Sequence, residues 1–148
     1  TLRSRGLGDV YKRQYQERCH AEVYKKLKTY TSSNTDINEV ISKLIADDFL
    51  NETRFSESFV RGKFKNKNWG KIRLILELKK RSISKKNIEI AMKQINQNIY
   101  EAKFKERFNF LIEKFKNEKK IIMKKKIFDY FNYRGWEHEI IYNEINKL

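Results

Sequence analysis

The chain has 148 residues, of which 39% are hydrophobic and 14% aromatic, with five glycines and no proline. This composition supports a packed core and leaves helices uninterrupted, so we expect an all-α fold and exclude a disordered chain. The formal net charge of +15 favours a polyanionic partner: nucleic acid, an acidic membrane surface or an acidic protein groove. A lone cysteine excludes an internal disulfide, and no apolar run reaches the roughly 18 residues of a membrane span. We therefore expect a cytoplasmic protein.

The first residues, TLRSRGLGDVYKRQ, resemble the translated end of a transposon adapter used in sequencing libraries. We expect residues 1–14 to be foreign to the natural protein and exclude them from functional reasoning. The rest of the chain is still strongly basic without them.

Three sets of apolar residues then recur with the same internal spacing, which predicts an internal repeat. In each set, an anchor is followed by apolar residues 10, 14 and 17 positions later. The sets are Leu27 with Ile37, Ile41 and Leu44; Leu78 with Ile88, Met92 and Ile95; and Phe131 with Ile141, Ile145 and Leu148. Val23, Leu74 or Ile127 lies one turn before each anchor. Each set predicts a helix, a short turn and a second helix.

The predicted turns carry residues that end or begin helices. Ser33 and Ser84 occupy equivalent places, and each is expected to accept a hydrogen bond from the first turn of the following helix. The third turn contains Gly135 and Trp136, and glycine permits a left-handed backbone there.

A longer helix is predicted before the second and third helix pairs, because aromatic residues recur there at helical spacing. The first stripe is Phe55, Phe59, Val60 and Phe64; the second is Tyr100, Phe104, Phe108, Leu111 and Phe115. We interpret both stripes as core. The chain is thus predicted to form three tandem three-helix repeats, 15–50, 51–97 and 98–148, in an elongated body. The first repeat lacks part of its leading helix.

Residues 68–84, NWGKIRLILELKKRSIS, combine an apolar and a charged set of side chains. The apolar set is Ile72, Leu74, Ile75, Leu76 and Leu78; the charged set is Arg73, Glu77, Lys80 and Arg81. We expect the apolar set to be buried and the charged set to lie opposite it. The charged side is either a solvated face with pairs four residues apart, or a surface that meets a partner.

The density of cations in this part of the chain favours a partner-facing surface. The predicted partner-facing residues are Arg61, Lys63, Lys65, Lys67, Lys71, Arg73, Lys79, Lys80, Arg81, Lys85 and Lys86. A second basic run, Lys119, Lys120 and Lys124 to Lys126, is interpreted as the solvated start of a helix. Trp69 and Trp136 are interpreted as packing anchors.

Residues for catalysis are not evident. One cysteine and two histidines cannot supply a zinc cluster, and no phosphate-binding GxxxxGK loop occurs. Cys19 and His20 are adjacent, so on a helix their side chains diverge and a reactive pair is not expected. We therefore predict no catalytic residue, no metal and no cofactor. Three binding roles stay open: a regulator on a protein–DNA filament, a stand-alone nucleic-acid binder, and a membrane-surface protein. The last is disfavoured because the apolar helix faces are needed for a core.

The central segment resembles the signature of the RecX family of bacterial recombinase regulators. The matching runs are Arg54-Phe55-Ser56-Glu57-Ser58-Phe59-Val60, then Trp69-Gly70, Arg73-Leu74, Glu77-Leu78 and Ile83, and later Tyr133-Arg134-Gly135-Trp136. Gln16 to Cys19 and Glu22-Val23 resemble the start of the family's first repeat. The similarity covers about residues 15–148, in family order.

This resemblance implies three tandem three-helix repeats and no enzymatic activity. It implies a protein that binds the RecA filament in its groove and restrains ATP hydrolysis, strand exchange and co-protease activity. It also implies non-specific contact with single- or double-stranded DNA, and we expect a monomer. The sequence departs from the family at Lys71, where proline is common, at Arg81-Ser82 in place of Lys-Gly, and at Tyr133 in place of a cation. Ser82 is expected to strain or reshape its turn.

Overall fold

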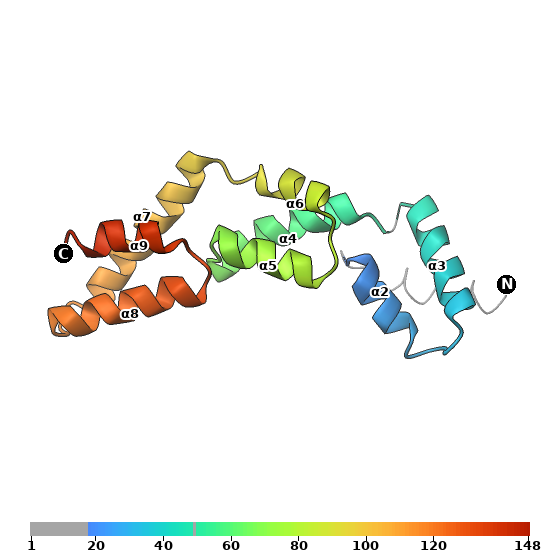
Figure 1. The fold of residues 1–148 in the computed structure, drawn as a ribbon, viewed down its shortest axis with the longest axis horizontal. Coiled ribbons are helices and arrows are strands. Elements are labelled where there is room, and N and C mark those ends of the chain that lie inside the picture. The colour runs from blue at the N-terminus through green and yellow to red at the C-terminus, as the bar shows by residue number, and fades with distance from the viewer. Residues whose placement is uncertain (1–17, 49) are drawn as a thin grey trace. The chain divides into compact units, whose positions relative to one another are not determined.

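A computed structural model describes residues 18–48 and 50–148, which form helices joined by short turns (Figure 1). The helices are α2 (His20–Leu27), α3 (Asn34–Ala46), α4 (Glu52–Lys67), α5 (Lys71–Lys80), α6 (Lys85–Met92), α7 (Gln97–Lys114), α8 (Lys120–Tyr133) and α9 (His138–Ile145). The described residues contain no strand, and the predicted all-α class is confirmed. Residues 1–14, interpreted as an adapter sequence, lie outside the described part.

The chain divides into two compact units. The first contains the described residues up to Phe59 together with Leu78–Ala91, and the second contains Val60–Glu77 and Met92–Leu148. Helices α4 and α5 therefore contribute residues to both units. The repeat boundaries predicted from the sequence remain a prediction, because the predicted second repeat, 51–97, is shared between the units.

Polar side chains cap the N-termini of four of these helices. Ser33 accepts a hydrogen bond from the backbone N–H of Asp36 (3.3 Å), and Ser84 accepts one from Asn87 (3.2 Å), so both predicted caps are confirmed. Asn51 caps α4 and Asn96 caps α7 in the same way, with distances of 3.0 Å and 2.8 Å to the donor nitrogens. Each cap satisfies a backbone donor that the helix itself leaves without a partner.

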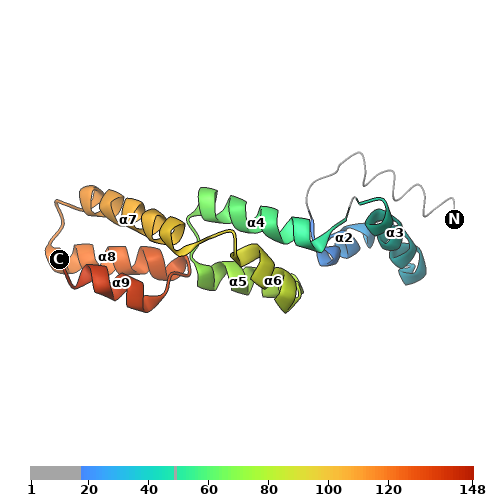
Figure 2. The same cartoon turned by 90° about the horizontal axis from the view of Figure 1, so that it is seen from above.

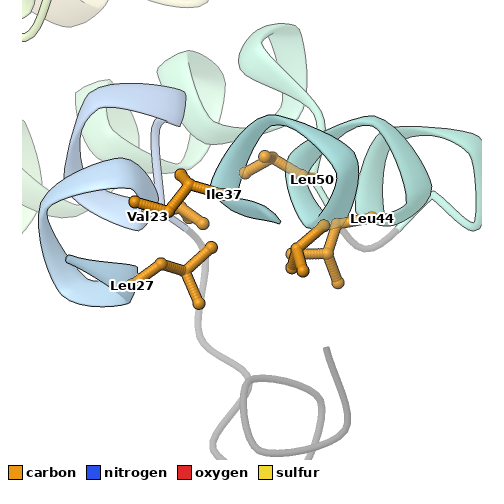
Figure 3. Packing of buried hydrophobic residues seen from close by; sticks show 6 residues of the cluster. Val23, Leu27, Ile37, Leu44 and Leu50 are labelled. Carbon is orange, nitrogen blue, oxygen red and sulfur yellow. The ribbon is translucent and has the colours of Figure 1, made fainter. Parts of the chain in front are cut away.

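The core of the first unit lies between α2 and α3. Its side chains point toward one another from the two helices and from the residues that follow α3 (Figure 3). The cluster is Val23, Leu27, Ile37, Val40, Leu44 and Leu50, and none of these exposes more than 2% of its surface. Burying one such side chain stabilises the fold by about 1.5–3 kcal/mol, which explains why this pair of short helices is held together.

The core of the second unit is aromatic. Tyr100, Phe104 and Phe108 form the buried stripe of α7, as predicted. The Phe104 ring lies 4.4 Å from the ring of Phe131 on α8. Helix α8 in turn runs alongside α9 in both views (Figures 1 and 2). The large rings thus pack α7 against α8 in the core of this unit.

The predicted anchors of the three helix pairs are also buried. Leu27, Leu78 and Phe131 expose 1%, 0% and 0% of their surfaces. The residues one turn earlier, Val23, Leu74 and Ile127, are each fully buried. The shared spacing in the sequence therefore corresponds to a shared pattern of buried residues.

The prediction for α5 was partly wrong. Leu74 is fully buried as expected, but Ile72 and Leu76 expose 51% and 49% of their surfaces. Arg73 and Arg81 of the charged set are instead partly buried. The physical reason is that both arginines place their guanidinium groups over aromatic rings, so cationic side chains cover part of the packed side and aliphatic ones face solvent.

Candidate partner and nucleic-acid interface

The turn between α8 and α9 caps the first turn of α5. The backbone N–H of Gly70 donates to the carbonyl of Arg134 (2.8 Å), and that of Ile72 donates to the carbonyl of Gly135 (3.0 Å). A helix start normally leaves these donors without partners. Two segments of the family signature, more than sixty positions apart in the sequence, are thereby joined by hydrogen bonds between backbone atoms.

Glycine is required on both sides of this contact. A Cβ on Gly70 would lie 2.5 Å from the carbonyl oxygen of Gly135. A Cβ on Gly135 would lie 2.3 Å from the Cβ of Arg73, and Gly135 also has a left-handed backbone with φ +80°. Both distances are too short for real side chains, so the approach of the two backbones depends on these glycines.

Trp136 is the packing anchor that the sequence predicted. It exposes 1% of its surface, and its ring stacks on Tyr100 at a centroid distance of 4.4 Å. Its indole N–H donates to the carbonyl of Asn68 (2.9 Å). A buried indole requires such an acceptor, so Trp136 holds the residues before α5 in place.

The Tyr100 hydroxyl connects three segments of the second unit. It accepts a hydrogen bond from the backbone N–H of Lys71 (3.0 Å) and donates to a carboxylate oxygen of Glu137 (2.9 Å). Burial raises the pKa of Tyr100 well above its usual value, and the neighbouring Glu137 raises this pKa further. Tyr100 therefore remains a neutral donor. A proline at position 71, common in the resembled family, has no N–H for this bond.

Arg73, a predicted partner-facing residue, is held between two rings. Its guanidinium carbon lies 4.3 Å from the Trp69 ring centroid and 4.8 Å from that of Tyr133. It also donates to the backbone carbonyl of Tyr133 (3.0 Å). The arginine is thus held in position by two aromatic rings and a backbone carbonyl.

The alternation of cation and ring continues beyond Arg73 within the second unit. Arg134 lies 3.7 Å from the centroid of Tyr130, and Arg107 lies 4.4 Å from that of Phe110. We call the following set the cation–aromatic row: Lys63, Trp69, Arg73, Tyr133, Arg134, Tyr130, Arg107 and Phe110. Sequence reasoning missed Arg107, Phe110 and Tyr130. The signal was available, because Phe110 lies three residues after Arg107 and Arg134 lies four after Tyr130, and such pairs are neighbours on a helix.

Arg81 is engaged in a similar way in the first unit. Its guanidinium carbon lies 4.7 Å from the Phe59 ring centroid, and its Nε lies 3.1 Å from a carboxylate oxygen of Glu22. Ser82 follows with φ 60°, the left-handed conformation that the substitution of a glycine was expected to strain. Arg81 thus contributes to packing within its own unit.

The other predicted partner-facing residues are distributed over α4, α5 and α6. Arg61 donates to the side-chain carbonyl of Gln94 (2.6 Å), and Lys71 places its ammonium 4.5 Å from the Tyr100 ring centroid. The exposed members are Arg61, Lys65, Lys67, Lys79, Lys80, Lys85 and Lys86. In the second basic run, Lys119, Lys120, Lys125 and Lys126 are exposed at the start of α8.

The remaining signature residues make contacts within the chain or are wholly or partly buried. Arg54 lies 3.2 Å from a carboxylate oxygen of Asp48 and donates to its backbone carbonyl (2.7 Å). Phe55 is buried, with its ring 5.7 Å from that of Phe59. Leu78 is fully buried, while Glu57 and Glu77 are partly buried.

Reactive groups are sparse in the described residues. Cys19 is fully buried, and burial raises the pKa of its thiol, which keeps it protonated and unreactive at neutral pH. Residues 18–48 and 50–148 contain no group of three or more His, Cys, Asp or Glu side chains arranged to hold a metal ion. Over the same residues, no helix has the length and apolar character needed to cross a membrane.

Comparison with known proteins finds similarity to proteins named as regulators. Residues 51–92 match the family model described as RecX, second three-helix domain. The chain is 31% identical over 87 residues to Regulatory protein RecX of Streptococcus uberis, with 59% of this chain and 34% of that protein covered. It is 27% identical over 131 residues to Regulatory protein RecX of Finegoldia magna, with 85% and 62% covered. The matches therefore span about a third and about three fifths of those relatives.

Two solved structures share the fold. The crystal structure of RecX from Lactobacillus salivarius matches with a TM-score of 0.79 and 25% identity, covering 98% of this chain and 94% of that one. A second crystal structure, of a regulatory protein RecX, matches with a TM-score of 0.81 and 17% identity, covering 99% and 72%. At 17% identity, the second match shows a shared fold alone. Together with the joined signature segments, these matches show that the chain is similar to RecX proteins in sequence and in fold.

Proposed function

We propose that this protein is a regulator that binds the RecA recombinase filament on DNA and restrains its ATP hydrolysis, strand exchange and co-protease activity. The observation that carries the proposal is the match to curated and crystallised RecX proteins over nearly the whole chain. The net charge of +15 supports it, because a filament built on DNA offers phosphates and acidic protein surface. No catalytic step is assigned to this chain.

The exposed lysines are the proposed contacts with the filament. Lys85 and Lys86 are exposed in the first turn of α6, directly after the capping residue Ser84. Cations at a helix start are unfavourable for the helix itself, because the dipole there is positive. Their presence at this place is therefore better explained by a partner than by stability of α6.

The experiment is a titration of RecA ATP hydrolysis on single-stranded DNA, with single-strand-binding protein in excess to cover bare DNA. We expect inhibition at amounts well below one regulator per recombinase, since a docked regulator acts on a whole filament. Inhibition only at amounts that coat the DNA, or no inhibition, would contradict the proposal.

A double charge reversal, Lys85→Glu with Lys86→Glu, tests the proposed contacts in the same assay. Acidic side chains at the start of α6 stabilise the helix by about 0.3–1 kcal/mol each, so the variant should fold at least as well as the parent. We expect it to need several times more protein for the same inhibition. The matched control reverses Lys25 and Lys26 on α2, which are exposed and outside the predicted partner-facing set. Equal inhibition by both variants would remove α6 from the interface.

A stand-alone nucleic-acid-binding protein is the second candidate, and the cation–aromatic row is the observation that favours it. Such a protein would bind DNA with the same affinity whether or not RecA is present. The filament regulator would bind RecA-coated DNA in preference to DNA covered by single-strand-binding protein.

A further inference from the structure

We propose that the cation–aromatic row is a binding surface for single-stranded nucleic acid, on which unpaired bases stack. This role goes beyond the regulation of a recombinase, because it requires only the second unit and a bare strand. All eight residues of the row belong to that unit.

The open rings of the row are the proposed stacking positions. Tyr133 exposes 70% of its surface and Phe110 exposes 50%, so a large part of each ring is open to solvent. Each ring has a guanidinium against it, Arg73 at 4.8 Å for Tyr133 and Arg107 at 4.4 Å for Phe110. The exposed surface of each ring remains available to a flat base.

The cations of the row are held in place before any ligand arrives. Arg73 donates to the carbonyl of Tyr133, and Arg107 donates from Nε to the hydroxyl of Tyr130 (3.1 Å). Because these side chains are already ordered, little conformational freedom is lost when they meet phosphates. A guanidinium can also stack on a base and bond to a phosphate with its free N–H groups.

The alternation of ring and cation favours a single strand over other polyanions. In a duplex the faces of the bases are covered by their neighbours, so exposed rings would have nothing to stack on. An acidic protein segment would need cations but not aromatic faces. A single strand presents both unstacked bases and phosphates, which is the combination that stacking surfaces in single-strand-binding proteins use.

The test is fluorescence anisotropy with a labelled oligothymidylate of about 16 nucleotides, without RecA. We expect Tyr133→Ala to weaken binding by about fivefold to a hundredfold, because one base loses its stacking partner. The mutation keeps the backbone carbonyl that Arg73 bonds, and the side chain is exposed, so folding should be unaffected. Tyr133→Phe keeps the ring and should bind as the parent does.

The matched control is Tyr142→Ala on α9. Tyr142 is also an exposed tyrosine of the second unit, at 48%, but it lies against Phe128 and outside the row. Binding by this variant should equal that of the parent. Circular dichroism confirms that each variant is folded.

Three results would overturn the proposal: unchanged binding by Tyr133→Ala, an equal loss in Tyr142→Ala, or binding of a duplex of the same length as tightly as the single strand. The last would indicate a phosphate surface without base stacking. These outcomes are independent of the ATP-hydrolysis titration. Single-strand binding by the row can therefore be disproved while filament regulation holds, and filament regulation can be disproved while single-strand binding holds.

Discussion

Two turns of the chain end a helix with the same hydrogen bonds but with different residues. After α5, the N–H of Ile83 donates to the carbonyl of Leu78 (3.2 Å), and the N–H of Ser82 donates to that of Lys79 (3.0 Å). After α8, the equivalent bonds of Trp136 and Gly135 reach Phe131 and Asn132, at 3.0 Å and 3.2 Å. This is the pattern of a Schellman motif, whose left-handed residue is Ser82 in one turn and Gly135 in the other.

The surroundings of the two turns explain the difference. Gly135 lies against the backbone of Arg73, where a Cβ does not fit. Ser82 is exposed, so its side chain has room, and the cost is only that of a left-handed backbone, about 1–2 kcal/mol. A glycine is thus indispensable where a second backbone approaches. At a turn that faces solvent, a serine is tolerated.

The largest effect is expected from Gly135→Ser, which gives the second turn the residue of the first. The clash with Arg73 adds to the backbone strain, so we expect a loss of about 3 kcal/mol or more in the free energy of unfolding. Urea denaturation followed by circular dichroism measures this change. A loss under 1 kcal/mol would mean that the approach of the two backbones is not rigid.

Tyr100→Phe removes a hydroxyl that bonds to Glu137, next to the turn after α8, and to Lys71 at the start of α5. The N–H of Lys71 and the carboxylate of Glu137 lose a partner, so we expect a loss of about 1–2 kcal/mol at neutral pH.

The same variant carries a pH signature. The folded-state pKa of Tyr100 is raised above the unfolded value of 10.0, so the unfolded chain loses its proton first as the pH rises. The stability due to the neutral hydroxyl is complete below about pH 10 and falls above it by up to about 1.4 kcal/mol per pH unit. The phenylalanine variant lacks this contribution. The check is to measure the free energy of unfolding of both proteins between about pH 9 and 11, on either side of the tyrosine pKa. Parallel curves would contradict a raised folded-state pKa for Tyr100.

Ser82→Gly is the reverse exchange and should stabilise the protein. It relieves the left-handed strain but adds flexibility to the unfolded chain, so a net gain of about 0.5–1 kcal/mol is expected. The midpoint of thermal unfolding should rise. A lower midpoint would show that the serine side chain stabilises the fold by more than its left-handed backbone costs.

The smallest effect is expected from Glu22→Gln, which removes the ion pair of Arg81 before the serine turn. Both side chains are about one-third exposed, and solvent screens such pairs, so we expect a loss of about 0.5 kcal/mol. The loss should shrink in high salt. An effect independent of salt would mean that Glu22 acts through packing instead.

Local features of this fold were predictable from the sequence. The caps at Ser33 and Ser84 and the left-handed Gly135 depend on residues close in the chain, and all three are confirmed. The buried stripes of α7 and the anchor residues follow from helical spacing in the same way.

Contacts between distant residues were not predictable. The bonds of Gly70 and Ile72 to the turn after α8 depend on tertiary packing, which no local pattern encodes. The exposure of Ile72 and Leu76 was also missed, because helical spacing separates two faces without deciding which is buried. Arg73 and Arg81 lie against aromatic rings, so they are partly buried where hydrophobicity alone predicts exposure.

The central claim, a regulator that docks on a recombinase filament, is tested most directly by co-sedimentation. RecA filaments are assembled on single-stranded DNA with a non-hydrolysable ATP analogue, and the protein is added to them or to DNA covered by single-strand-binding protein. The account predicts saturable sedimentation with the RecA filaments and little with the covered DNA. Equal sedimentation with both, or none with the filaments, would contradict it.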